Sequence, residues 1–279
     1  MRGVNLRQLK SSLIIAMEKT VSGQPKSSSI DLVKDEFISI VSHELRTPMS
    51  TIKGYLDMLL AGDAGPVSPQ IRDVLTEMLL AIEREIRLVN GMLDINRLEA
   101  GKMSFALKES VDVVAQARLL IQSLVRSASE KKLSLILETP SEPLPNIQAD
   151  TDKLVQVLIN LVGNALKFTK KGATSVNFYK DGDFVVTCVE DTGPGIPVDK
   201  QNHIFEKFSQ ASTKKTRISG GSGLGLYISK IIIEKMGGKI WLGQSKTGVG
   251  SKFCFSLPVS GSTRAKEVYK ELSEEDKTP

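Results

Sequence analysis

The chain has 279 residues, of which 41% are hydrophobic and 25% are charged. These values are ordinary for soluble proteins, exclude a largely disordered chain, and at roughly 150 residues per domain predict about two globular domains. The net charge is +5, but basic residues are spread along the chain and aromatic residues make up only 5%, which argues against a nucleic-acid partner.

The apolar stretches are too short for a targeting or membrane segment. The longest one near the start covers residues 13–17, shorter than the core of a signal peptide, and nothing approaches the ~18 residues needed to cross a bilayer. We therefore expect a cytoplasmic chain without a membrane segment. A longer parent protein would still be free to carry one.

Both cysteines lie in apolar, strand-like runs. Neither Cys188 nor Cys254 belongs to a CxxC motif or has a histidine beside it. This pattern predicts two buried, reduced thiols and excludes zinc and disulfide assignments.

The first part of the chain has helical periodicity. Residues 1–30 hold a short amphipathic stretch that is broken by glycine, proline and a serine run, and we interpret them as an N-terminal segment or linker. Apolar residues then recur every three or four positions over 31–60 and again over 71–93, with turn residues between these stretches. The pattern predicts an antiparallel helical hairpin, and we place this domain at residues 31–102.

Two helices alone have too little core to be stable. Additional apolar residues widen the apolar stripe of each predicted helix, among them Phe37, Ile40, Leu79 and Met92. Association of two hairpins into a four-helix bundle would cover these stripes, so we expect a homodimer.

Short strands and helices alternate after Gly101. We expect strands at 133–138, 174–180, 184–190, 239–242 and 251–257, and helices at 111–130, 152–168 and 224–236. The order predicts an α/β sandwich over residues 103–258, with helices on one face of a mixed sheet. Residues 259–279 are polar and are expected to be frayed or to form a short helix.

A histidine with two polar neighbours lies inside the first predicted helix. At about 100° per residue, His43 points away from the apolar stripe marked by Val41 and Leu45, so we expect it to face solvent. Glu44 places a carboxylate next to the ring, which can hold one ring nitrogen as N–H and leave the other free to attack an electrophile. Thr47 lies one turn further on. A lone exposed histidine is usually an ordinary surface residue, but these neighbours favour a nucleophile.

Proline interrupts the same helix one residue after Thr47. Pro48 has no N–H, so it frees the Glu44 carbonyl and should bend the helix. The alternative is a tolerated kink, but because proline inside a helix costs about 3 kcal/mol, a functional bend is favoured.

Asparagines mark the polar face of the helix expected at 152–168. Asn160 and Asn164 are four residues apart, and Lys167 follows one turn later. The buried stripe is expected to consist of Leu154, Leu158, Leu161, Ala165 and Phe168. Every amphipathic helix has a polar face, but asparagines are poor helix residues, and their oxygens suit a Mg²⁺ ion bound to phosphates. A nucleotide–metal site is the better interpretation.

A glycine-containing turn follows the strand expected at 184–190. Asp191 can accept a hydrogen bond from the exocyclic amine of adenine, and Gly193 and Gly195 let the chain turn tightly and approach a flat ring. An ordinary turn is an equal alternative for this motif taken alone.

A second glycine-rich segment, residues 220–226, opens the last predicted helix. Backbone N–H groups at a helix N-terminus form an anion site for phosphates, and glycines permit close approach. The chain has no GxxxxGK[ST] motif, which excludes a P-loop. Residues 204–217 between the two glycine motifs suggest a lid from which Arg217 or a lysine reaches a terminal phosphate, although a solvated loop is the alternative.

Taken in order, these motifs resemble the transmitter core of a sensor histidine kinase of two-component signalling. The resemblance covers about residues 31–258. It implies a dimerisation and phosphoacceptor hairpin, followed by an ATP-binding catalytic domain of the gyrase, heat-shock chaperone and mismatch-repair ATPase superfamily (a Bergerat-type fold).

The resemblance also implies roles for single residues. His43 is the implied phosphoacceptor, Glu44 the general base, and Thr47 the residue that positions water for dephosphorylation of the partner. The residues implied to bind Mg²⁺ and ATP are Asn160, Asn164, Lys167, Phe168, Asp191, Gly193, Gly195, Phe205, Phe208, Arg217, Gly221, Gly223, Leu224, Gly225 and Leu226, with Asn160 and Asn164 as the metal ligands.

The implied activity is autophosphorylation on histidine and transfer to an aspartate of a response-regulator receiver domain, together with phosphatase activity toward that receiver. Three features depart from the family pattern. Ser222 stands where threonine is commoner, which is a mild change. The chain shows no recognisable sensor domain, and Gly23 and Pro25 interrupt the helix that would carry a signal into the hairpin. Two alternatives stay open, a chaperone-like or topoisomerase-like ATPase and a degenerate scaffold that docks a receiver without turnover.

Overall fold

The computed structural model describes residues 27–99, 103–209 and 222–275. The side chains of residues 27–40, 42, 43, 99, 273 and 275 lie outside this description. The chain divides after Met103 into two units, which are taken in turn below. The short amphipathic stretch expected near the N-terminus and the break after it lie outside the described residues.

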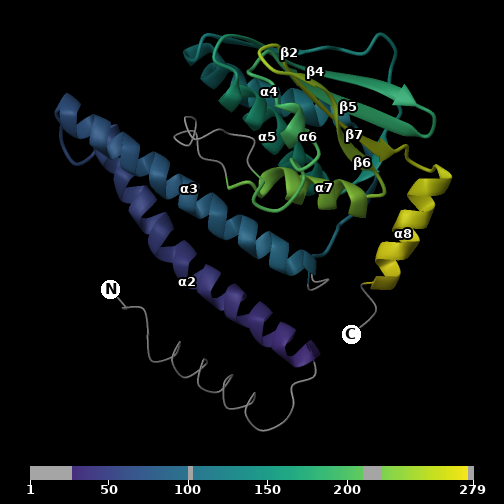
Figure 1. Ribbon diagram of the computed structural model, residues 1–279, viewed down its shortest axis with the longest axis horizontal. Helices are drawn as coiled ribbons and strands as arrows, with labels where there is room; N and C mark the ends of the chain where they lie inside the picture. Colours follow the sequence, from purple (N-terminus) through teal and green to yellow (C-terminus); the bar gives the residue numbers. More distant parts are fainter. Residues whose placement is uncertain (1–26, 100–102, 210–221, 276–279) are drawn as a thin grey trace. The chain divides into compact units, whose positions relative to one another are not determined.

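The first unit is a pair of antiparallel helices (Figure 1). Helix α2 (Ser27–Ala61) remains helical through Pro48, and α3 (Pro69–Glu99) returns alongside it. Polar contacts join the helices. The Lys53 ammonium lies 3.3 Å from the Glu83 carboxylate, Arg46 Nε donates to Asn90 Oδ1 at 3.2 Å, and Arg72 Nη1 donates to the Leu60 carbonyl at 3.0 Å. The hairpin expected from periodicity is confirmed.

Most of the apolar stripe of this hairpin remains in contact with solvent. Leu56, Leu93 and Ile95 are buried, whereas Leu45 and Ile52, expected on the same stripe, are 45% and 46% exposed. The other exposed large apolar side chains of the hairpin are Tyr55, Met58, Ile71, Val74, Met78, Leu80 and Met92. An apolar surface of this extent marks a region that associates with another protein surface.

The second unit is built on a five-stranded mixed sheet. Its strands are β2 (Leu133–Leu137), β4 (Gly172–Asp181), β5 (Phe184–Asp191), β6 (Lys239–Lys246) and β7 (Gly250–Pro258). They are arranged in the order β2-β4-β5-β7-β6, with β2 parallel to β4 and every other pair antiparallel.

Three helices cover one face of this sheet (Figure 1). They are α4 (Val113–Glu130), α5 (Thr151–Phe168) and α7 (Gly225–Lys235). Aspartates at the N-caps start the first two: Asp112 accepts from the Ala115 amide, and Asp150 accepts from the amides of Asp152 and Lys153. Alternate side chains along β4, β5 and β7 lie on the helix-covered face, while Val186, Cys188 and Cys254 form a separate buried cluster against Trp241. The expected α/β sandwich is confirmed.

Several short elements escaped the sequence prediction. Strands β1 (Lys108–Val111) and β3 (Ile147–Ala149) form a separate two-stranded sheet, and α6 (Val198–Gln201) is a single turn. The polar tail forms the 13-residue helix α8 (Thr263–Glu275), which buries Ala265 and Val268. A helix was one of the two outcomes expected for this tail.

One residue of the buried stripe predicted for α5 lies elsewhere. Phe168 is 41% exposed, and the Lys167 ammonium lies 5.0 Å from the centre of its ring. The prediction of a core position was wrong because Phe168 is the last residue of the helix. Its side chain therefore lies where α5 no longer covers the sheet.

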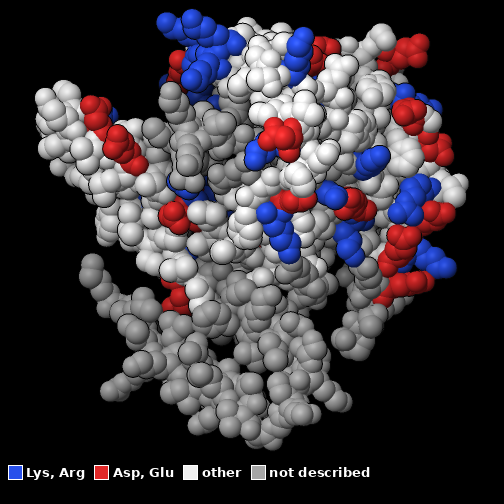
Figure 2. Space-filling model, viewed as in Figure 1, with Lys and Arg blue, Asp and Glu red and all other residues white. Residues whose placement is uncertain are grey.

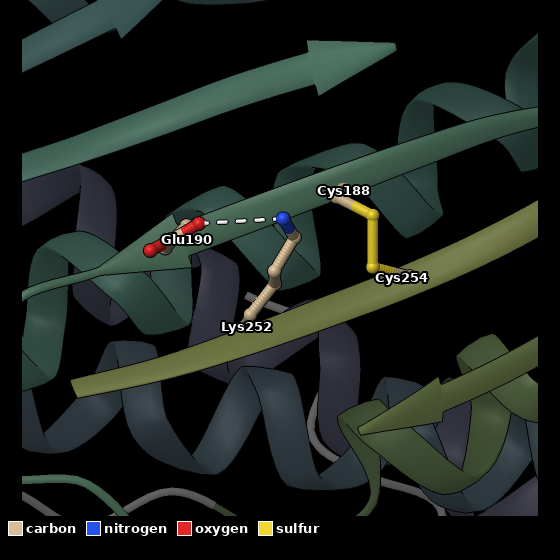
Figure 3. Close-up of a disulfide and its surroundings, with 4 residues drawn as sticks. All are labelled: Cys188, Glu190, Lys252 and Cys254. Carbon is tan, nitrogen blue, oxygen red and sulfur yellow. Dashed lines mark ion pairs between the residues drawn. A yellow bond between two sulfur atoms is a disulfide. The ribbon is translucent and has the colours of Figure 1, made fainter. Parts of the chain in front are cut away.

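The prediction of two reduced thiols was also wrong. Cys188 on β5 and Cys254 on β7 are buried, as expected, but they form a disulfide (Figure 3). The two residues are direct partners in the antiparallel register, beside the ion pair of Glu190 and Lys252. Because the cysteines are 66 residues apart in sequence, only the pairing of β5 with β7 brings them together.

Cleavage of this disulfide is expected to destabilise the second unit. Closing a loop of this length restricts the unfolded chain, and such crosslinks typically add about 2–4 kcal/mol to the free energy of unfolding. We expect dithiothreitol to lower the Tm of the wild type and to leave a Cys188→Ala/Cys254→Ala variant unchanged, as measured by calorimetry. Two alkylatable thiols in unreduced, unfolded protein would contradict the pairing.

Charged side chains of both signs are intermixed over much of the face seen in Figure 2. Among the described residues, no helix combines the length and the apolar character needed to span a membrane.

Candidate functional site

The first group of candidate residues lies on α2. His43 belongs to this helix by its backbone, and its side chain is outside the described part of the structure. Glu44, which follows His43 directly, and Thr47, one helical turn later, are both exposed. The expected solvent exposure of this segment is therefore observed at both neighbours of the histidine.

Helices α5 and α7 bring the asparagines to the second glycine motif. Asn160 Nδ2 donates to Ser229 Oγ on α7 at 2.9 Å, and Asn164 Nδ2 lies 3.4 Å from Asn160 Oδ1. Gly225, the first residue of α7, approaches the Asn160 amide so closely that a β-carbon there would overlap with its oxygen. Amide oxygens and the N–H groups of a helix N-terminus thus lie side by side, as metal–phosphate binding requires.

The aspartate of the first glycine motif is the last residue of β5. Asp191 Oδ1 accepts from the Gly193 amide at 2.8 Å. Gly193 lies against the end of α5, because a β-carbon on it would come within 3.3 Å of Thr169 Oγ1 and 3.5 Å of the Phe168 carbonyl carbon. The first glycine motif and the asparagine-bearing helix α5 therefore meet.

The loop after Asp191 is fixed to the β6–β7 turn. Gly195 has a φ of +67° and no space for a side chain, because a β-carbon would overlap the Lys246 carbonyl oxygen. The Gly248 amide donates to the Pro194 carbonyl at 2.7 Å, and the Ile196 amide donates to Ser245 Oγ at 2.8 Å. These contacts hold the glycine loop rigidly beside Asp191.

The second glycine motif also contacts the aromatic segment. Gly223 has a φ of +72°, and a β-carbon on it would lie 2.6 Å from the Phe208 carbonyl carbon. Phe208 itself is 56% exposed, whereas Phe205 packs edge-on against Phe253 with ring centres 6.3 Å apart. Leu224 is fully buried and Leu226 is partly buried.

The lid expected from the sequence lies outside the described residues over positions 210–217. Arg217 and Gly221 lie outside the described residues. The second histidine, His203, is exposed and lies 2.8 Å from the Glu206 carboxylate, which agrees with its assignment as a surface residue.

Burial alters the acidity of the key carboxyl group. Removal of Asp191 from water raises its pKa above the ordinary aspartate value, and the charge of Glu190 adds to this effect. Backbone hydrogen bonds from Gly193 and Ser251 oppose it and lower the pKa. A ligand that donates hydrogen bonds to this carboxyl group would stabilise its charged form and lower its pKa.

Several polar residues of the site were missed by sequence reasoning. Ser229 holds Asn160, Ser245 anchors the glycine loop, and Gln201 Nε2 donates to the Ile196 carbonyl at 2.9 Å. Serine and glutamine outside glycine-rich or asparagine-rich motifs gave no signal of their own. Only the fold places them at the site.

Two family models match the chain. Residues 33–101 match the His Kinase A (phospho-acceptor) domain. Residues 149–261 match the histidine kinase-, DNA gyrase B- and HSP90-like ATPase. The first match covers the helical hairpin with His43, and the second covers the asparagine, aspartate and glycine motifs.

Curated relatives are similar over most of this chain. The circadian input-output histidine kinase CikA of Synechococcus elongatus is 31% identical over 90% of the chain and 33% of its own length. The sensor histidine kinase WalK of Bacillus subtilis is 32% identical over 94% of the chain and 41% of its own length. The chain thus spans well under half the length of these relatives.

Solved structures show the same architecture. The crystal structure of full-length ShkA in complex with AMPPNP aligns with a TM-score of 0.64 at 33% identity, covering 81% of this chain and 46% of that one. The histidine kinase AdeS of Acinetobacter baumannii, at 22% identity and a TM-score of 0.53, covers 78% of this chain and 98% of its own and supports the fold. The chain therefore belongs to the histidine kinases, with a phospho-acceptor hairpin followed by an ATPase domain of the histidine kinase, gyrase B and HSP90 type.

Proposed function

We propose that this chain uses ATP to phosphorylate itself on His43 and passes the phosphoryl group to an aspartate of a response-regulator receiver domain. The observation that carries the proposal is that one helix, α5, contacts both glycine motifs: Asn160 lies against Gly225 at the start of α7, and Gly193, hydrogen-bonded to Asp191, lies against the C-terminal end of α5. The same chain contains a hairpin with a His-Glu-x-x-Thr segment, in which Glu44 and Thr47 are exposed. One unit can then hold the nucleotide while the other supplies the acceptor.

The second unit binds both the adenine base and the phosphates of the nucleotide. Asp191 accepts from the exocyclic amine of adenine, while Gly193 and Gly195 allow the ring to lie against the backbone. The N–H groups at the start of α7, near Gly223 and Gly225, hold the phosphates. Lys167, Phe168 and Phe208 lie at exposed positions at the rim, and Arg217 is assigned to the terminal phosphate.

Asn160 and Asn164 are suited to hold a Mg²⁺ ion between the protein and the phosphates. Ser229 occupies the Asn160 amide nitrogen, which leaves the Asn160 oxygen directed toward Asn164. When bound, the ion neutralises charge on the phosphates. The two side chains keep their oxygens fixed because both belong to one rigid helix.

The hairpin carries the phosphoryl chemistry. A neutral His43 nitrogen attacks the γ-phosphorus in line, the P–N bond forms as the bond to the bridging oxygen breaks, and ADP leaves. Glu44 takes the proton from the other side of the ring and keeps the attacking nitrogen unprotonated. We also propose a phosphatase activity toward the receiver, in which Thr47 positions the water that hydrolyses the receiver's phosphate.

A homodimer completes the hairpin. Two copies of the exposed apolar stripe, which includes Leu45 and Ile52, form the core of a four-helix bundle. We assign residues 31–102 to the dimerisation and phosphotransfer domain and 103–258 to catalysis, with 1–30 as linker and 259–279 as a C-terminal extension. We place the reaction in the cytoplasm, where ATP and receiver domains are available.

Incubation with γ-labelled ATP, followed by addition of a set of receiver domains, tests this proposal. We expect label on the chain that is stable to base and labile to acid, and that moves to an aspartate of one receiver. Release of inorganic phosphate without labelled protein would instead identify a chaperone-like or topoisomerase-like ATPase. The absence of both binding and label would identify a scaffold.

The raised pKa of Asp191 predicts a pH dependence of nucleotide binding. Because the folded-state pKa lies above the unfolded value, the stability that this carboxyl contributes to the free protein is complete below the unfolded value. This contribution to stability is lost as the pH rises through the folded-state pKa. Adenine binding, in contrast, requires the charged form of Asp191, which accepts the hydrogen bond. We therefore expect the Kd for ATP to increase as the pH falls toward this pKa.

Asp191→Asn provides the matched variant for this prediction. The amide has no charge to desolvate, so we expect the Tm of the free protein to be retained or raised. It also replaces one acceptor oxygen by a donor, which should weaken ATP binding at least tenfold and remove the acid-dependent step. Calorimetric titration from pH 4.5 to 8 measures both effects, and an unchanged acid-dependent step in the variant would assign it to another group.

A further inference from the structure

A serine hydroxyl is buried in α7 among isoleucines. Ser229 is 2% exposed, and the other buried residues of this helix are Ile228, Ile232 and Ile233. A buried hydroxyl needs a hydrogen-bond partner, because leaving it unpaired is costly. Ser229 Oγ has its partner on the neighbouring helix, where it accepts from Asn160 Nδ2 at 2.9 Å. The hydroxyl is therefore directed at an asparagine of the candidate site.

Two pairs of residues with helical spacing meet where α5 and α7 contact each other. Gly225 and Ser229 are four residues apart on α7, and Asn160 and Asn164 are four residues apart on α5. Each pair therefore lies on one face of its helix. Gly225 leaves room for the Asn160 amide, whose oxygen lies where a β-carbon would stand. Gly225 and Ser229 thus contact the two ends of the same amide group.

The contacts of Asn160 determine which end of its amide carries the oxygen. The oxygen and nitrogen of an asparagine amide are nearly equal in size, so packing alone does not choose between the two orientations. Ser229 accepts from Nδ2. Oδ1 lies against Gly225 at the start of α7, where the positive end of the helix dipole favours an oxygen over an amino group. Both contacts select the same orientation.

The orientation of Asn160 is passed on to Asn164. Asn164 Nδ2 donates to Asn160 Oδ1 at 3.4 Å, a contact that requires Asn160 to present its oxygen. With its nitrogen turned toward Asn160, Asn164 keeps its own oxygen for a ligand. An amide oxygen binds a metal ion, whereas an amide nitrogen carries its hydrogens toward the ion. A chain of two hydrogen bonds thus leads from the hydroxyl on α7 to the oxygen of Asn164.

We propose that Ser229 is a positioning residue for metal-dependent nucleotide binding. The inference rests on the proposed function, because it takes Asn160 and Asn164 to be the residues that hold Mg²⁺ with the nucleotide. Ser229 contacts neither the ion nor the phosphates. It holds Asn160 so that both asparagines present oxygens, rather than nitrogens, to the ion. Removal of a group that orients metal ligands in this way typically lowers metal affinity about 10- to 100-fold.

Ser229→Ala removes the acceptor with little change in volume. We expect the affinity for ADP with Mg²⁺ to fall roughly tenfold, and the affinity for ADP in EDTA to stay within about twofold. Calorimetric titration of the full chain measures both, and ADP is used so that no phosphoryl transfer accompanies binding. The ratio of the two Kd values is the readout. A merely structural serine would lower the Tm and weaken both affinities in parallel.

A double-mutant cycle tests whether Ser229 acts through Asn160. A carboxylate has an oxygen at both ends and needs no orientation, so in an Asn160→Asp background Ser229→Ala should leave the dependence on Mg²⁺ unchanged. Ser123→Ala is the control, because the Ser123 hydroxyl bonds the Leu120 carbonyl within α4 at 2.7 Å. This variant should keep the wild-type ratio of Kd values.

Two results would overturn the inference while leaving the proposed function intact. The first is a Ser229→Ala protein that keeps the full dependence on Mg²⁺. The second is an equal loss of that dependence in the Asn160→Asp background. A wild type whose affinity for ADP does not depend on Mg²⁺ would instead contradict the proposed metal site. If Ser229→Ala fails to fold, Ser229→Cys carries the same test, because a thiol is similar in shape but a weak acceptor.

Discussion

Replacement of His43 by alanine is expected to abolish autophosphorylation and to leave ATP binding intact. The residue lies on α2 in the hairpin unit, whereas every described group assigned to the nucleotide belongs to the second unit. Removal of the imidazole deletes the only nucleophile assigned to the reaction and touches no residue of the nucleotide site. The loss of label from γ-labelled ATP should therefore be complete, with a Kd for ATP within about twofold of the wild-type value.

The second histidine offers a matched control. His203 is exposed and paired with Glu206, and no role in the reaction is assigned to it. His203→Ala should incorporate label at the wild-type rate, which excludes a general effect of losing an imidazole. Persistent label on the His43→Ala protein would show that the phosphoacceptor has been wrongly assigned.

Replacement of Asn164 by alanine is expected to abolish both phosphorylation and ATP binding. The Asn164 side chain lies beside the Asn160 oxygen, next to the start of α7, where metal and phosphates are proposed to bind. Its loss removes a ligand oxygen and the contact that orients Asn160. We expect the affinity for Mg²⁺-ATP to fall by at least roughly two orders of magnitude, or about 3 kcal/mol, so that no binding is detected at concentrations that saturate the wild type.

Asn177 provides the control for this substitution. It lies on β4 opposite Cys188, on the face of the sheet away from Asp191. Asn177→Ala should bind Mg²⁺-ATP as the wild type does, as measured by calorimetric titration. Binding by Asn164→Ala at wild-type affinity would contradict the nucleotide site proposed here, whereas a lower Tm without nucleotide would indicate a structural role for the amide.

Much of the architecture was predictable because it depends on local periodicity. The helical repeat of apolar residues located α2, α3 and α5, and the runs of β-branched residues located β4 and β5. The polar motifs could also be predicted from local sequence, because their residues are unusual in the elements that carry them. Asn160 and Asn164 are unusual choices inside a helix, and the glycines after Asp191 stand out at the end of an apolar strand.

The features that escaped prediction depend on pairing between distant segments. The disulfide requires the register of β5 against β7. Strands β1 and β3 are too short for a periodic signal. Phe168 was misplaced because periodicity does not show where a helix loses contact with its sheet.

The central claim is that the imidazole of the hairpin receives the γ-phosphoryl group of ATP. Mapping of the phosphorylated site by mass spectrometry, with the protein kept in alkaline solution after reaction with ATP, tests it most directly. A P–N-linked phosphate on His43 is the predicted result. Phosphate on His203, or on a serine or threonine of either unit with His43 unmodified, would contradict it.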